Sequence, residues 1–216
     1  LFITATARND WFSVLNPANN SKLYPSLGGS FVFTDAFQNM PDWLTYGKLR
    51  AAWGQVATAN VRAYSSAVTY GLSGVSHLTL PMANFSGGDN IPNPNLSPAL
   101  STEFEVGTDL RFFKGRLGLE FTYYDQKTTD DILSATISRA SGFWSTSINI
   151  GELSNKGIEL LVNATPIQGE FTWDISLNIA KNKNKVIALS GTATELNVEE
   201  PRTRTVMIKH IVGQPY

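Results

Sequence analysis

The chain has 216 residues and no cysteine, and charged residues make up only 16% of it. Ordinary soluble domains carry about 25% charged residues. The formal net charge is −1 at pH 7, so no overall electrostatic field points to nucleic acid as a partner. The lack of cysteine excludes disulfides and thiolate metal sites, and no apolar run approaches the ~20 residues that a membrane helix needs.

Seven segments are predicted to be strands, and the clearest of them alternate apolar and polar residues with the period of two that is typical of strands with one apolar face. In chain order they are residues 1–9, 23–34, 46–57, 101–113, 116–127, 155–166 and 170–180, and residues 203–212 are a possible eighth strand. Residues 35–40 are predicted to form one helical turn that Asp35 caps. The chain opens within a strand, without a signal peptide, so we expect residues 1–216 to be a fragment of a longer protein.

The fourth and fifth strands show the alternation most clearly, because one face is apolar and the other carries charge. Their apolar positions are Phe104, Val106, Leu110, Phe112, Leu117, Leu119, Phe121 and Tyr123. Their charged positions are Glu103, Glu105, Asp109, Arg111 and Glu120. In the seventh strand, Asp174 takes the same place opposite an apolar row. This indicates a sheet with one apolar side and one hydrated side.

The connections between these strands alternate in length. The long ones are residues 10–22, 58–100, 128–154 and 181–203, and the short ones are residues 35–45, 114–115 and 168–169. Long loops at one end and short turns at the other are typical of the antiparallel wall of an outer-membrane barrel. The predicted fold is therefore all-β, an antiparallel up-and-down meander.

Six stretches resemble, in the same order, the SusC-like TonB-dependent transporters of Bacteroides-group bacteria. They are residues 4–13, 23–37, 48–56, 93–133, 149–162 and 173–186. The resemblance implies a transmembrane β-barrel of about 22 strands with a plugged lumen, of which residues 1–216 would be a wall segment.

The same resemblance implies a function and its partners. The parent protein would lie in the outer membrane of a Gram-negative bacterium, in contact with outer-membrane lipid, and would import nutrients such as glycan oligosaccharides or peptides. A SusD-like surface lipoprotein would cap it, and the TonB complex would drive it through an N-terminal part that is absent here. It implies no enzyme activity and no cofactor.

Candidate site residues follow from these faces and loops. The lumen-lining candidates are Glu103, Glu105, Asp109, Arg111, Glu120 and Asp174. The candidates for aromatic belts at the membrane interfaces are Trp53, Trp173, Tyr123 and Phe112. The candidates for ligand binding in the long loops are Trp144, Phe143 and Trp11, although packing within the loops is an equal explanation.

Catalysis and metal binding find little support in the residues. Glu103 and Glu105 share a strand face, as the paired carboxylates of a glycosidase can, but surface acids often do the same. The histidines, His77 and His210, are far apart and lack any metal-ligand spacing.

Two other architectures fit the alternation. The first is a soluble carbohydrate-binding β-sandwich, which would bury its apolar faces between two sheets. The second is a small self-closed barrel, since eight strands are enough to close one.

Overall fold

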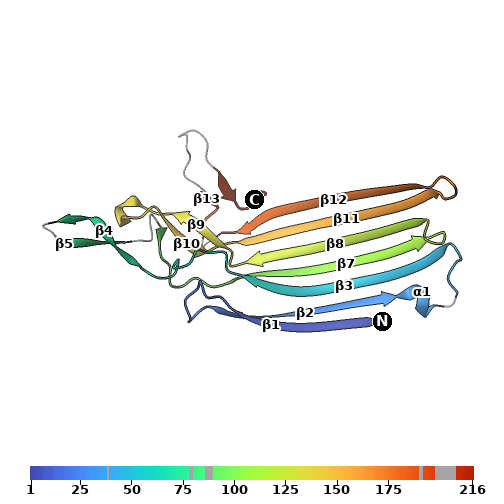
Figure 1. The fold of residues 1–216 in the computed structure, drawn as a ribbon, viewed down its shortest axis with the longest axis horizontal. Helices are drawn as coiled ribbons and strands as arrows, with labels where there is room; N and C mark the ends of the chain where they lie inside the picture. Colours follow the sequence, from blue (N-terminus) through green and yellow to red (C-terminus); the bar gives the residue numbers. More distant parts are fainter. Residues whose placement is uncertain (38, 78–79, 86–89, 190–191, 198–207) are drawn as a thin grey trace.

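The computed structural model describes residues 1–37, 39–77, 80–85, 90–189, 192–197 and 208–216. Its main feature is a seven-stranded antiparallel sheet in the order β1-β2-β3-β7-β8-β11-β12 (Figure 1). The strands are β1 (Phe2–Trp11), β2 (Ser21–Val32), β3 (Leu44–Thr58), β7 (Ala99–Phe112), β8 (Leu117–Thr129), β11 (Glu152–Ile167) and β12 (Trp173–Ala188). Each pairs with the neighbouring long strands in chain order, which confirms the predicted up-and-down meander.

The sheet is open, because β1 and β12 form its two edges in the described part of the chain. A small self-closed barrel is therefore wrong as a description of this chain. An open sheet of long strands leaves two rows of backbone donors and acceptors without partners, so the fold needs further strands on both sides.

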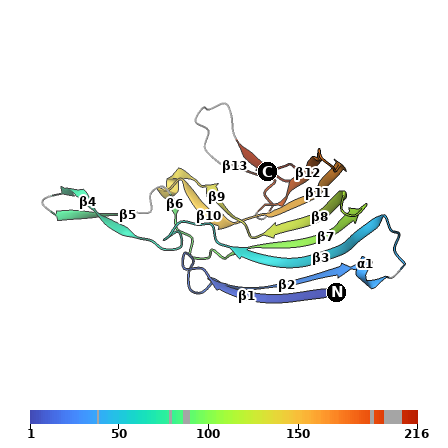
Figure 2. The same ribbon diagram turned by 45° about the vertical axis from the view of Figure 1, so that its right-hand side comes forward.

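The connections lie at two ends of the sheet (Figures 1 and 2). At the turn end are α1 (Phe33–Ala36) and the tight connections 113–116 and 168–172. At the loop end lie the small elements β4 (Tyr70–His77), β5 (Leu80–Phe85), β6 (Asn90–Ile91), β9 (Ile132–Thr136), η1 (Arg139–Ser141), β10 (Ser145–Asn149), β13 (Glu195–Asn197) and β14 (Lys209–Ile211). No helix in the described ranges is both long and apolar enough to span a membrane.

Two local expectations differ from the structure. The helical turn begins at Phe33 and contains Asp35, and the N-cap is Val32, which makes no side-chain cap hydrogen bond. Packing holds this turn in place instead, because the Phe33 ring occupies the space that a side chain at Gly47 would need. Of the possible eighth strand, residues 203–207 lie outside the described residues, and β14 pairs with β13 and not with the main sheet.

The apolar face of the main sheet is uncovered. Leu27 is 53% exposed, Phe104 46% and Ile179 48%. The buried cluster is small and lies at the loop end, where Ile150, Val186 and Leu189 pack together. A β-sandwich would have buried these rows between two layers, so that alternative does not describe this chain.

Together, the outward apolar rows form a band across the sheet. The limit of this band nearest the long loops, its loop-side limit, slopes toward the turn end from β3 to β12. One register row joins Trp53, Phe104, Asp125, Lys156 and Lys183. On β3 and β7 this row is still apolar, whereas on β12 the continuous outward apolar row ends at Ile179, four positions closer to the turn end, and lysines follow it. Four residues are ~13.6 Å along a strand and four strand spacings are ~19 Å, which gives a tilt of roughly 35°. Strands of membrane barrels tilt by about 35–45°.

Candidate functional site

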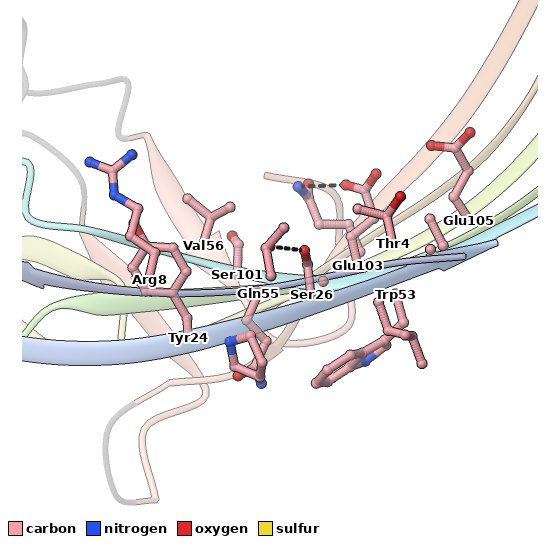
Figure 3. A pocket seen from close by; sticks show the side chains of 17 residues that line it. Thr4, Arg8, Tyr24, Ser26, Trp53, Gln55, Val56, Ser101, Glu103 and Glu105 are labelled. Atoms are coloured by element: carbon pink, nitrogen blue, oxygen red, sulfur yellow. Dashed lines mark hydrogen bonds between the residues drawn. The ribbon is translucent and has the colours of Figure 1, made fainter. Parts of the chain in front are cut away.

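The polar face of the sheet is the candidate functional surface. Strand register places all six predicted lumen residues on it, because each alternates with an outward apolar neighbour. Glu103, Glu105, Asp109 and Arg111 alternate along β7, and Glu120 of β8 lies directly opposite Asp109. Figure 3 shows Glu103 and Glu105 on the concave side of the sheet and the Trp53 indole on the other side.

Arg50 of β3 is the centre of a charged network on this face. Its guanidinium donates to Glu105 of β7 and to the Thr122 hydroxyl of β8, and its Nε lies 3.5 Å from Asp109 Oδ1. Lys48 donates to the other Asp109 oxygen at 3.1 Å. All four charged side chains are partly buried. Such charge-assisted hydrogen bonds are stronger than neutral ones, so the network holds three neighbouring strands in register on the polar side.

A glycine makes this network possible. Arg50 reaches β8 only by lying across β7 at Gly107, its register partner. A Cβ at Gly107 would stand 2.8 Å from Arg50 Nε and 2.8 Å from the Phe121 carbonyl oxygen. Gly157 of β11 does the same for Tyr124, whose hydroxyl would lie 2.5 Å from an added Cβ. Glycines on this face therefore give large polar side chains room to lie flat over the next strand.

A hollow of about 530 Å³ opens on the polar face nearer the loop end (Figure 3). Its lining comes from β1, β2, β3, β7 and β8, and it includes Arg8, Tyr24 and Glu103. The Tyr24 hydroxyl donates to Asp10 at 2.5 Å, and Arg8 donates to the same carboxylate at 2.7 Å. Gln126 donates to Glu103 at 3.0 Å. Polar groups that are fixed by their neighbours present a defined hydrogen-bonding surface to anything that enters the hollow.

The remaining lumen candidates lie nearer the turn end. Arg111 lies over the Tyr46 ring, with its Cζ 5.4 Å from the ring centroid. Asp174 accepts a hydrogen bond from Thr165 at 2.6 Å. These two residues lie outside the Arg50 network, so the polar face has several separate sets of charges.

Two of the three candidate loop aromatics lie together, and the third lies apart from them. Trp144 precedes β10 and is 44% exposed, and the Arg139 guanidinium stacks on its ring at 3.7 Å. Phe143 is its immediate neighbour and is half-buried. Trp11 is the last residue of β1, and its alternation with Asp10 places it on the outward face. Trp144 and Phe143 are thus together at the loop end, and Trp11 is not with them.

A second hollow, of about 940 Å³, lies among the loops, and Ser145, which follows Trp144 in the chain, is part of its lining. Its lining is mostly hydroxyl and amide side chains from residues 60–69, 90–92, 132–134 and 145–147. The parallel pairing of β6 with β10 brings Asn90 against Ser145 and so joins two loops that are distant in sequence. In the described residues no group of three or more metal-ligating side chains comes together.

The belt candidates all face outward and fall into two levels. Phe112 and Trp173 lie at the turn end, where Trp43 stacks on Phe112 with ring centroids 5.7 Å apart. Trp53 lies at the loop-side limit of the apolar band, and Tyr123 lies one row closer to the turn end. Aromatic girdles at both edges of an outward apolar band are a feature of membrane barrels.

A match to a protein-family model establishes the family of this chain. Residues 1–199 match the model described as TonB dependent receptor-like, beta-barrel. The chain belongs to this family of outer-membrane β-barrels.

Two TonB-dependent receptors illustrate the relationship in sequence. TonB-dependent receptor P26 of Formosa agariphila is 29% identical over 172 residues, which cover 77% of this chain and 17% of that protein. TonB-dependent receptor SusC of Bacteroides thetaiotaomicron is 30% identical over 169 residues, which cover 76% of this chain and 17% of that protein. The chain therefore spans about a sixth of the length of the receptors that it matches.

The fold has a close counterpart among solved structures. The RagAB peptide transporter superposes with a TM-score of 0.87 at 24% identity, over 99% of this chain and 23% of that one. The open seven-stranded sheet thus has the fold of one part of a SusC-like receptor barrel, as predicted.

The alternation in the sequence assigned the acidic residues of this site to the polar face. It did not identify their basic partners, Lys48 and Arg50, as site residues. Lys48 and Arg50 alternate with Leu49 and Ala51 on β3 as clearly as the acids do on β7. The signal was therefore present, but the pairing of residue 50 with positions 105, 109 and 122 depends on register between distant strands.

Proposed function

We propose that this chain is a wall segment of a TonB-dependent transporter that imports nutrients across the outer membrane, either glycan oligosaccharides or peptides. The observation that carries the proposal is the two-faced sheet: an ion-paired polar side and an uncovered apolar side with aromatic edges, in a chain of the receptor family. In this function the polar face lines the conduit, and Glu103, Glu105, Asp109, Arg111, Glu120 and Asp174 contact plug, water and cargo.

The proposal includes the partners of the whole transporter. A SusD-like surface lipoprotein would cap the loop end, and the TonB complex would act through the N-terminal part of the full protein. The RagAB and SusC relatives support this assembly, and the matches in Formosa and Bacteroides support a Bacteroides-group bacterium as the source. No chemical step is assigned to the chain, because in its described part the charged groups at the centre of the polar face pair with each other, as Arg50 does with Glu105 and Asp109.

Cargo contact is proposed at the loop end, on Trp144 and Phe143 and at the mouth of the loop hollow. The Trp144 ring is held by Arg139 and stays accessible, and an exposed aromatic ring can stack on a sugar or on an apolar peptide side chain. Trp11 remains a candidate for contact with a lid protein, because it is exposed at the loop end of β1.

The test uses the full-length transporter in its native host. Deleting its gene should abolish growth on one oligosaccharide or peptide source, and unchanged growth on every such source would refute nutrient import. In the same host, Trp144→Ala should weaken cargo capture by about threefold to tenfold, the loss expected for one stacking contact. Phe171→Ala is the matched control, because Phe171 is an exposed aromatic residue in the short connection between β11 and β12 at the turn end. An equal effect of both variants would reject the Trp144 site.

A further inference from the structure

The outward face of β8, β11 and β12 changes from apolar to basic at the loop-side limit of the apolar band. Along β12 the outward row runs through Ile175, Leu177 and Ile179 and then continues as Lys181, Lys183 and Lys185. The neighbouring strands add Lys156 on β11 and Lys127 on β8. These five residues, Lys127, Lys156, Lys181, Lys183 and Lys185, are the outer lysine patch.

Register brings these lysines together on one face. Lys183 lies directly opposite Lys156, and Ser154 of β11 has Lys185 on one side and Lys127 on the other. Two of the five have acidic partners: Lys156 donates to Asp125 at 2.6 Å, and Lys127 lies 2.7 Å from Glu152. Lys181, Lys183 and Lys185 are exposed and pair with no carboxylate in the described part of the chain. The patch therefore carries a surplus of three positive charges.

The position of Lys183 opposite Lys156 is unfavourable for the sheet alone. Like charges directly opposite each other on neighbouring strands destabilise the pairing. Asp125 neutralises one side of Lys156, but no acid in the described residues stands beside Lys183. A bound anion between the two strands would remove this repulsion, and this points to a negatively charged ligand for the patch.

The level of the patch identifies the kind of anion. The lysines begin where the outward aliphatic row ends, on the side of the long loops, which face the outside of the cell in barrels of this kind. Lysine stems can lie along apolar surface while the ammonium groups reach the polar headgroup region. A ligand there meets the ammonium groups and the rows of Leu177 and Ile179 together, so it has an anionic head and an apolar tail.

We infer that the outer lysine patch binds the phosphate groups of lipids in the outer leaflet of the outer membrane. Three ammonium groups at every second residue of β12 are spaced ~6.8 Å apart along the strand, and Lys183 can share one phosphate with Lys156 across the strand pair. Lysine binds phosphate as a point charge, and basic residues beside a membrane draw anionic headgroups. This site is on the lipid side of the wall, so the inference does not depend on the transported cargo.

The experiment uses the full-length transporter, purified in neutral detergent and titrated with bisphosphorylated lipid A in mixed micelles. Lys181→Gln combined with Lys183→Gln should weaken binding at least tenfold, and raising the salt concentration should weaken wild-type binding in the same direction. Lys181→Arg with Lys183→Arg should retain binding. The matched control is Lys22→Gln with Lys114→Gln, which removes two charges from the polar face and the turn end and should change the affinity less than twofold.

Three results would overturn the inference. They are equal affinity of the Lys181/Lys183 glutamine variant and wild type, equal binding of fully dephosphorylated lipid A, and competition by millimolar inorganic phosphate as effective as competition by the lipid. The last result would indicate a site for free phosphate. Heat-dependent gel migration reports whether each variant barrel is folded, and the arginine variant separates loss of charge from loss of fold.

Discussion

Gly107→Ala tests whether the charged network depends on a flat approach of Arg50 across β7. The new Cβ would stand 2.8 Å from Arg50 Nε and 2.9 Å from Cζ, where ordinary contacts are 3.4–4 Å. The guanidinium must therefore move by roughly 0.6 Å or more, away from Glu105 and Thr122. The Phe121 carbonyl oxygen, also 2.8 Å away, belongs to the backbone and cannot yield as easily.

The expected loss of stability is about 1–3 kcal/mol, the usual range for overpacking a site with no free space. Gly118→Ala is the control, because Gly118 lies on the same face of the next strand and its added Cβ would meet Asn163 at an ordinary 3.8 Å. That variant should be neutral or gain up to about 1 kcal/mol, since alanine restricts the unfolded chain. Both are measured by denaturant unfolding of the full-length transporter in lipid, followed by tryptophan fluorescence.

The double variant Arg50→Ala with Gly107→Ala separates the two close contacts. If the guanidinium causes most of the strain, the cost of Gly107→Ala should fall by at least about 1 kcal/mol when Arg50 is already removed. Equal stability of the Gly107→Ala and Gly118→Ala proteins would show that the approach of Arg50 to β7 is not required, and would refute the reasoning.

Three further predictions follow from the two faces and the open edges. Leu160→Lys should lower the free energy of unfolding by about 2–4 kcal/mol, because Leu160 faces outward near the middle of the apolar band. Leu161→Lys should lower it by less than about 1 kcal/mol, because Leu161 lies on the polar face opposite Glu120. Equal losses for the two variants, measured by unfolding in lipid, would contradict the assigned faces. Gly157→Ala should destabilise the barrel by about 1–3 kcal/mol, because its Cβ would meet the Tyr124 ring and, at 2.8 Å, the Lys181 carbonyl oxygen. Tyr124→Ala should relieve the part of that loss that the ring causes, measured in a double-mutant cycle, and additive losses would be the contrary result. Residues 1–216 expressed alone should sediment without detergent, since both sheet edges and the apolar face are uncovered, and a monomeric soluble species in analytical ultracentrifugation would contradict this.

The strands and their faces were predictable because the period of two extends over long segments. On β7 and β12 the alternation of Phe104 with Glu103, or of Ile175 with Asp174, assigns each residue to a side without knowledge of neighbouring strands. Strand ends were less well predicted: β12 continues to Ala188, eight residues beyond the predicted end at 180, because its outward row changes from aliphatic residues to lysine and so loses the apolar signal.

Contacts between distant segments were not predictable from one sequence. Arg50 meets Thr122 because β3 and β8 both pair with β7, and the register of those pairings sets which residues face each other. The parallel pairing of β6 with β10 in the loops likewise joins residues 90 and 145, and no local sequence pattern predicts this pairing. The place of Trp11 depended on where β1 ended, since one residue of strand decides the side on which a ring projects.

The length of β11 and β12 has a consequence for where cargo is first met. Each has 16 residues, which at a tilt of roughly 35° gives a height of about 44 Å, whereas the apolar band of a membrane barrel is about 25 Å tall. Almost 20 Å of hydrogen-bonded wall therefore lies beyond the apolar band, in the headgroup regions and past them. Under the proposed function, cargo would first meet the protein above the apolar core of the membrane, and a lid would rest on the loop ends of these strands.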